Sequence, residues 1–331
     1  MHLAAGFTES FGSASNPFGF AEAQARPNSL GRPMSTNLKS PTQPNQSACV
    51  TNQLRDNTRM PQKPPPIPPA KTIDEVIESI DTIIDWSITA KSRLGYFAAL
   101  YKRITAAVRV ALKQGAFENN ARMESFDVAF ANRYFAALNG YFYPDKQPTP
   151  THAWQVTFDA ATRSEPVIVQ HMLGGVNAHI GLDLGIIAQS IAPHAQLPSL
   201  QEDFNRINAV LGSQVDGVVQ SINELSPVLA DLYAVLQDNE INLITETLNS
   251  FRDNAWTFAT VLAGEPDVLH PGTILAQDLQ VAQQGALMYN PLVPLGAIVS
   301  TIAAQESRNV ARNIRALDEI ASTLAPIKTT M

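Results

Sequence analysis

The sequence predicts an all-α fold, and three observations lead to that prediction. From residue 72 onward, apolar side chains recur at the three- and four-residue spacing of helices in one segment after another. No pair of segments has the alternating pattern of paired strands, and no unit of fixed length repeats along the chain. We therefore expect a single bundle of roughly eight to ten helices.

The first 71 residues differ from the rest in composition. They mix Ser, Asn, Gln and Gly without periodicity, and eleven of the 23 prolines lie among the first 70 residues. We expect residues 1–71 to form a disordered arm and residues 72–325 to form the helical domain. The arm ends in the proline run of residues 63–69, which should adopt polyproline II. This run could dock on an aromatic-lined groove of a partner domain or act as a stiff spacer, and we favour the spacer.

Charge and cysteine usage narrow the class of protein. The first 71 residues hold seven Lys/Arg against three Asp/Glu, a net charge of +4. Since the whole chain has a net charge of −7, the remaining residues carry −11. This acidic body argues against a nucleic-acid partner.

The one cysteine, Cys49, cannot form an intramolecular disulfide, so we expect a cytoplasmic protein. No secretory signal is evident, and Pro294 interrupts the apolar stretch of residues 291–304, so we expect no transmembrane helix.

The first three helices follow from their caps and apolar stripes. Thr72, followed by two acidic residues, predicts a helix start, and this helix should end near Ala90. The next helix should end at Gly115, with Arg103 outside its apolar stripe. Residues 123–141 are apolar almost all round, which predicts a helix that is buried on most sides.

The remaining helices follow in the same way. Pro193 should end a long helix, and Ser199 with Glu202 reads as the capping box of the next one. The expected helices are residues 153–162, 167–191, a helix from 199 onward, 228–237, 241–263, 273–288 and a last long helix at 295–321.

The expected helix at residues 167–191 carries an unusual set of polar residues. His171, His179 and Asp183 share an arc of roughly 120° at about 100° per residue. His179 and Asp183 are four residues apart, so their side chains could form a hydrogen bond or hold one divalent metal ion. His171 lies about 12 Å along the axis from His179. A metal site would therefore need ligands from other helices.

Two residues of other helices could complete this site. Asp203 stands beside a buried stripe, where a carboxylate needs a partner. Arg252 lies on an apolar stripe and is a plausible counter-ion for Asp183 or Asp203, although a purely structural buried salt bridge is the plainer interpretation. Further candidates are Asp127, Asn132, Glu306 and Arg308.

The same helix is rich in glycine, and two explanations remain open. Each glycine costs up to roughly 1 kcal/mol in a helix relative to alanine. Something must therefore approach the backbone closely, either a neighbouring helix or a bound ligand. The glycines are Gly174, Gly175, Gly181 and Gly185.

Four ordered motifs together are similar to an uncharacterised microbial family, domain-of-unknown-function family 5995. They are residues 92–101, 130–134, 170–185 and 203–208, and the likeness covers about residues 72–320. The resemblance implies a helical protein with no assigned activity, and the histidines and aspartate match the family's central motif. Gly181 stands where a polar residue is more usual, which weakens any site that needs a further ligand on that turn.

Two functions fit these residues. The known hydrolase, nucleotide, zinc-helix and di-iron motifs are missing from the sequence. The first function is a small-molecule enzyme in which His179, assisted by Asp183, acts as general base or metal ligand, with His171, Asp203 and Arg252 in the same pocket. The alternative is a non-catalytic bundle that binds a ligand or a partner helix and uses the same side chains as internal hydrogen-bond partners.

Overall fold

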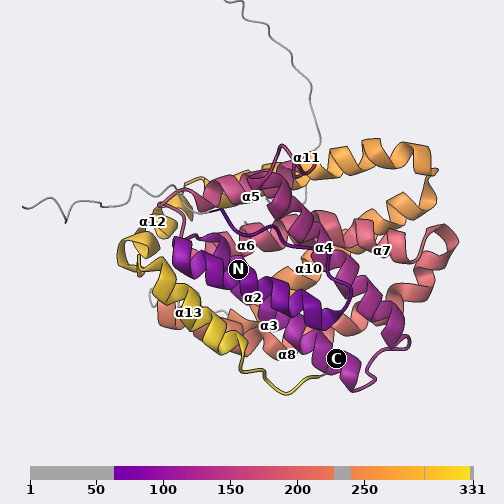
Figure 1. Cartoon of the computed structure of the whole chain (residues 1–331), viewed down its shortest axis with the longest axis horizontal. Coiled ribbons are helices and arrows are strands. Elements are labelled where there is room, and N and C mark those ends of the chain that lie inside the picture. The colour runs from indigo at the N-terminus through magenta and orange to yellow at the C-terminus, as the bar shows by residue number, and fades with distance from the viewer. Residues whose placement is uncertain (1–62, 227–239, 294, 329–331) are drawn as a thin grey trace, which may run out of the picture. The chain divides into compact units, whose positions relative to one another are not determined.

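The computed structural model describes residues 63–226, 240–293 and 295–328, which belong to one compact unit, Pro61–Met331 (Figure 1). Within these residues it has eleven α-helices and no strand, so the all-α prediction is confirmed with one helix more than expected. The helices are α2 (Ile73–Ala90), α3 (Leu94–Lys113), α4 (Asn120–Phe142), α5 (His152–Ala161), α6 (Ile168–Ala178), α7 (Gly185–Ile191), α8 (Gln201–Leu225), α10 (Glu240–Gly264), α11 (His270–Tyr289), α12 (Leu295–Gln305) and α13 (Val310–Ala321). A π-helix, η1 (His179–Leu184), and two 3₁₀ helices, η2 (His194–Leu200) and η3 (Asp267–Leu269), complete the set.

The predicted boundaries of the first helices are confirmed. The Thr72 hydroxyl accepts a hydrogen bond from the Glu75 amide at 3.2 Å, which caps α2. After α3 the chain turns at Gly115, whose φ of 68° lies in the left-handed region that favours glycine. Arg103, which was expected outside the apolar stripe, is nevertheless buried and donates to the carbonyls of Ile320 and Thr323. It satisfies carbonyl groups at the end of α13, where helices leave them without partners.

Residues 63–71 form a strap along α4. Every third residue of the strap is buried, namely Pro64, Ile67 and Ala70, as the threefold period of polyproline II requires. The Asn139 side chain accepts from the Ile67 amide at 2.9 Å and donates to the Ile67 carbonyl at 2.8 Å. Asn132 does the same to the amide and carbonyl of Ala70, at 2.8 and 2.9 Å. The proline run therefore packs on the helical bundle itself.

The helix expected at residues 167–191 is not regular. It consists of α6, the π-helix η1 and α7, which follow each other without a break. The π-helix includes both His179 and Asp183. Such wide turns are rare and occur often at functional sites.

Side chains of neighbouring helices fill the space that the glycines leave. A Cβ atom on Gly175 would lie 2.3 Å from the ring of Phe97, and one on Gly174 would lie 2.0 Å from the Tyr289 hydroxyl. Glycine at these two positions thus allows α3 and α11 to pack closely on α6 through their aromatic residues.

Other expectations were wrong or fall outside the described residues. The last long helix is split into α12 and α13, because the Asn309 side chain caps the amide of Arg312 and starts a new helix. The Ser199 hydroxyl accepts from Arg122 instead of capping α8. The helix expected at residues 228–237 lies outside the described residues. None of the described helices is long and apolar enough to cross a membrane.

Candidate functional site

His179 and Asp183 form a buried pair, which we call the His–Asp pair. The Nδ1 atom of His179 lies 3.4 Å from Oδ2 of Asp183, and the two side chains are 3% and 1% exposed. Oδ2 also accepts from Trp154 Nε1 at 2.8 Å, and Oδ1 accepts from Arg133 Nε at 2.5 Å. Three elements, α4, α5 and η1, therefore hold one carboxylate.

The protonation states of the pair follow from its surroundings. Burial raises the pKa of Asp183, but the Arg133 guanidinium and the bonds from His179 and Trp154 outweigh it and leave the pKa below its usual value. Burial lowers the pKa of His179 more than Asp183 raises it. At neutral pH Asp183 is therefore ionised and His179 is neutral, and the Asp183 carboxylate accepts a hydrogen bond from the Nδ1–H group of His179. The Nε2 atom keeps a lone pair and has no hydrogen-bond partner in the described part of the chain.

Aromatic rings surround His179 on several sides. Phe130 stacks face to face on the imidazole, with 3.5 Å between ring centroids and 5° between planes. Tyr101 approaches edge-on at 4.8 Å. The other rings within about 6 Å are Phe97, Tyr134 and Trp154. Phe130 is only half-buried and the Arg133 side chain is 30% exposed, so these two residues of α4 cover the pair.

Asp127 adds a buried acid on the same helix as Phe130 and Arg133. Its side chain is buried and its Oδ2 atom has no hydrogen-bond partner among the described residues. Burial, with a smaller contribution from Glu124, raises the pKa of Asp127 to about 7. After the effect of burial, the Asp127 charge is the next cause that raises the pKa of Tyr101. An acid with a raised pKa and a histidine with a lowered one thus both lie near Tyr101.

The pair does not fit a divalent metal. Both oxygens of Asp183 already accept from nitrogen donors, and the Arg133 guanidinium occupies the place of the cation. Across residues 63–226, 240–293 and 295–328, no three His, Cys, Asp or Glu side chains cluster in a way that could hold a metal ion. The chemistry of this donor set is that of a hydrogen-bonded imidazole.

Asp203 lies away from the pair. Its two oxygens accept from the backbone amides of Glu118 and Asn119, at 2.7 and 3.1 Å, and so bind the start of α4. Arg122 lies 3.3 Å from the same carboxylate. Asp203 thus stabilises the N-terminus of α4, where the helix dipole favours a negative charge.

Arg252 does not neutralise either aspartate, contrary to the sequence-based expectation. Its guanidinium donates to the Phe204 carbonyl at 2.7 Å and to the Asn208 side chain, and it lies 4.3 Å above the Phe204 ring. Burial lowers the pKa of Arg252 to about 9. Arg252 therefore joins α10 to α8 without contributing to the His–Asp pair.

His171 is buried at the other end of α6. Its ring neighbours are Tyr96 and Tyr289, each at 5.8 Å between centroids, rather than His179 or Asp183. Burial, and then the charge of Arg93, lower the pKa of His171 to about 3. The two histidines on this helix thus have separate surroundings.

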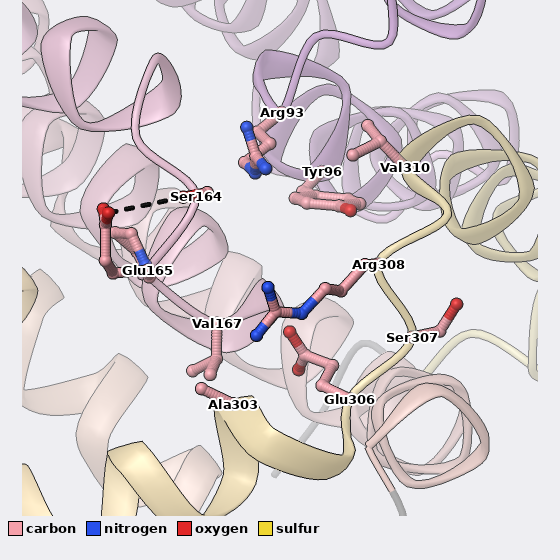
Figure 2. A pocket seen from close by; sticks show the side chains of 11 residues that line it. Arg93, Tyr96, Ser164, Glu165, Val167, Ala303, Glu306, Ser307, Arg308 and Val310 are labelled. Atoms are coloured by element: carbon pink, nitrogen blue, oxygen red, sulfur yellow. Dashed lines mark hydrogen bonds between the residues drawn. The ribbon is translucent and has the colours of Figure 1, made fainter.

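A surface pocket lies beside this end of α6 (Figure 2). Arg93 and Tyr96 at the start of α3 form one wall, and Glu306 and Arg308 between α12 and α13 form another. The loop before α6, including Glu165, closes the third side.

The residues that sequence reasoning missed come from other helices. Arg133 is one of the few polar residues in a helix that is otherwise apolar, and Trp154 gave no signal at all. A charged residue in a helix that is otherwise apolar is a sign of a buried partner. The identity of that partner depends on how α4 and η1 pack, which local sequence does not encode.

Comparisons with known proteins bear on the family of the chain. The model of a family described as a family of unknown function (DUF5995) matches residues 73–291. Comparisons with curated proteins and with solved structures gave no match. The matched residues run from α2 to the end of α11 and include the His–Asp pair, Arg133 and Trp154. The chain therefore belongs to the DUF5995 family of unknown function.

Proposed function

We propose that the protein is a small-molecule enzyme in which His179 acts as general base and Asp183 orients it. One observation carries this proposal. The Nδ1 side of His179 is held by Asp183, which is itself held by Arg133 and Trp154, whereas the buried Nε2 atom has no partner among the described residues. A buried acceptor without a partner costs about 1–3 kcal/mol, so it calls for an explanation.

The arrangement supports proton transfer at Nε2. The neutral imidazole takes a proton from the substrate at Nε2, and the ionised Asp183 stabilises the imidazolium that forms. Arg133 keeps the pKa of Asp183 low, so this carboxylate stays ionised throughout. Asp127, with its pKa near 7, is the acid available to return a proton.

Access to Nε2 requires α4 to yield locally. The Phe130 ring covers one face of the imidazole and is itself half-buried. Rotation of this ring toward solvent would admit a small molecule, whereas the Asp183 side of the imidazole stays closed. The substrate is then a small molecule with an apolar part that replaces Phe130 among the aromatic rings.

A second function is favoured by the enclosure of the pair. His179 is 2% exposed and packs against five aromatic rings. In a ligand-binding or interaction bundle the pair would only hold α4, α5 and η1 together.

For either function we propose that the protein is cytoplasmic and has a small-molecule partner and no nucleic-acid partner, in line with its acidic body and single cysteine.

The variant His179→Phe separates the two functions. Phenylalanine keeps the aromatic packing and removes both nitrogen atoms. His179→Phe removes both the hydrogen bond to Asp183 and the unpartnered Nε2 acceptor. If the pair serves catalysis, the gain from removing the acceptor should offset the lost bond, and the free energy of unfolding should stay level or rise. If the pair is structural, the lost bond should dominate, and the free energy of unfolding should fall by about 1–3 kcal/mol.

A ligand screen gives the functional readout. We would compare the melting temperatures of wild type, His179→Phe and the control His152→Gln against a library of small metabolites. His152 is a suitable control because its side chain is 60% exposed and lies outside the His–Asp pair. The enzyme predicts compounds that stabilise the wild type and the control but not His179→Phe. Equal stabilisation of all three proteins by every active compound would contradict it.

A further inference from the structure

The pocket in Figure 2 contains two arginines, Arg93 and Arg308, for which the described residues supply no ion-pair partner. The guanidinium of Arg308 reaches into the pocket, with Arg93 on the opposite wall. Every other lining residue is neutral or acidic, yet no carboxylate among the described residues lies within 4.0 Å of either guanidinium. Two guanidinium groups that face one pocket and are not paired with a carboxylate can attract an anion.

The nearby carboxylates are already in use. Glu165 is turned to Ser164 and lies 3.6 Å from Arg163, and its side chain is 71% exposed. Glu306 accepts from the Ile168 amide at 2.9 Å and from the Ser226 hydroxyl. The two pocket arginines are therefore available to an external anion.

The backbone adds to the positive field at the same place. Helix α3 begins at the wall of the pocket directly after Arg93 and has no side-chain cap, whereas Glu306 already bonds the first amide of α6 and Asn309 caps α13. Each helix N-terminus carries roughly half a positive charge. Helix α3 has 20 residues, long enough for a full dipole. The field at its N-terminus thus has the same sign as the two guanidinium groups.

The size of the pocket limits what it can hold. Its cavity volume is about 30 Å³, and about 10–15 Å³ on this measure is enough for one water molecule. The pocket therefore accommodates a single small anionic group and leaves the remainder of a larger molecule in solvent. We propose that it binds the phosphate or carboxylate group of a small molecule through Arg93 and Arg308.

Guanidinium chemistry supports this class of ligand. The planar fork of arginine matches the paired oxygens of carboxylate and phosphate, and such charge-assisted bonds are the stronger ones. The pocket is separate from the His–Asp pair, since its lining residues do not include His179 or Asp183. Anion binding here is therefore independent of whether His179 is a base.

The test is a calorimetric titration of the full chain with inorganic phosphate and, separately, with acetate, at low ionic strength. The variants are Arg93→Gln, Arg308→Gln and both together. Arg315→Gln is the matched control, since Arg315 is an exposed residue of the adjoining α13 that does not line the pocket. Thermal unfolding of each variant checks that the fold is intact.

We expect saturable binding of at least one anion to wild type and to Arg315→Gln, weakened about tenfold by each pocket substitution and lost in the double variant. Binding of acetate alone would identify a carboxylate as the group, and binding of phosphate alone would identify a phosphate. Undiminished binding by the folded double variant would overturn the proposal. Failure of the wild type to bind either anion saturably would overturn it as well.

Discussion

Replacement of Asp127 by asparagine should stabilise the protein, and more so at high pH. The pKa of this buried carboxyl is raised from 3.8 to about 7. The pKa is higher in the folded state than in the unfolded state, so ionisation of Asp127 destabilises the folded protein. This free-energy penalty is absent below about pH 4, grows up to about pH 7 and is complete above it. Three pKa units at about 1.4 kcal/mol each correspond to a penalty of about 4 kcal/mol. Asparagine has a similar shape and cannot ionise, so it removes this penalty.

Urea unfolding of wild type and Asp127→Asn at about pH 5 and about pH 8 measures the effect. We expect the variant to gain a few kcal/mol at the higher pH and distinctly less at the lower one. Asp159→Asn is the control, because Asp159 is an exposed aspartate. A gain of equal size at both pH values, or a loss at about pH 8, would refute the assignment of a raised pKa to Asp127.

Three further predictions concern the core and the strap. Asp183→Ala should lower the free energy of unfolding by about 1–3 kcal/mol, because it leaves the Trp154 donor buried without a partner; an unchanged or raised free energy of unfolding in urea would contradict this. Asn139→Ala should speed hydrogen exchange of the Ile67 amide about tenfold or more, because that amide loses its acceptor; unchanged exchange would show that the strap is held by other contacts. His171→Gln should reduce the loss of stability on acidification. Because the pKa of His171 is lowered in the folded state, the free energy of unfolding should fall by about 1.4 kcal/mol per pH unit as the pH drops below 6.5. If the free energy of unfolding depends on pH equally in wild type and variant, a neutral buried His171 is contradicted.

The parts of the fold that were predicted correctly depend on local sequence. The start of α2 follows from Thr72 and the first-turn acids, and the end of α3 follows from Gly115. The contact between His179 and Asp183 also follows from their spacing of four residues. These features are set within one or two helical turns, so periodicity and capping residues are enough to predict them.

The parts that were not predicted depend on contacts between distant segments. Arg133 reaches Asp183 across 50 residues of chain, and Arg252 reaches the Phe204 carbonyl across 48. Helical periodicity assigns each residue to a face but does not say which helix that face meets. Arg252 was therefore placed correctly on a buried stripe and assigned the wrong partner.

The π-helix and the strap also required the structure. A periodicity of 3.6 residues describes a regular helix, so it hides the wider turn at His179–Leu184 that sets the direction of both side chains. The strap looks like a spacer in sequence because its threefold period matters only when Asn132 and Asn139 are aligned along α4. In both cases tertiary packing selects one of several conformations that the sequence allows.

The most direct test of the central claim is the protonation state of the His179 imidazole, measured by ¹⁵N NMR from about pH 5 to about pH 8. The buried pair predicts a ring that is neutral at about pH 7 and above, with the proton on Nδ1 and a free lone pair on Nε2. Chemical shifts of that tautomer would support a base poised at Nε2. A proton on Nε2, or an imidazolium at neutral pH, would contradict it.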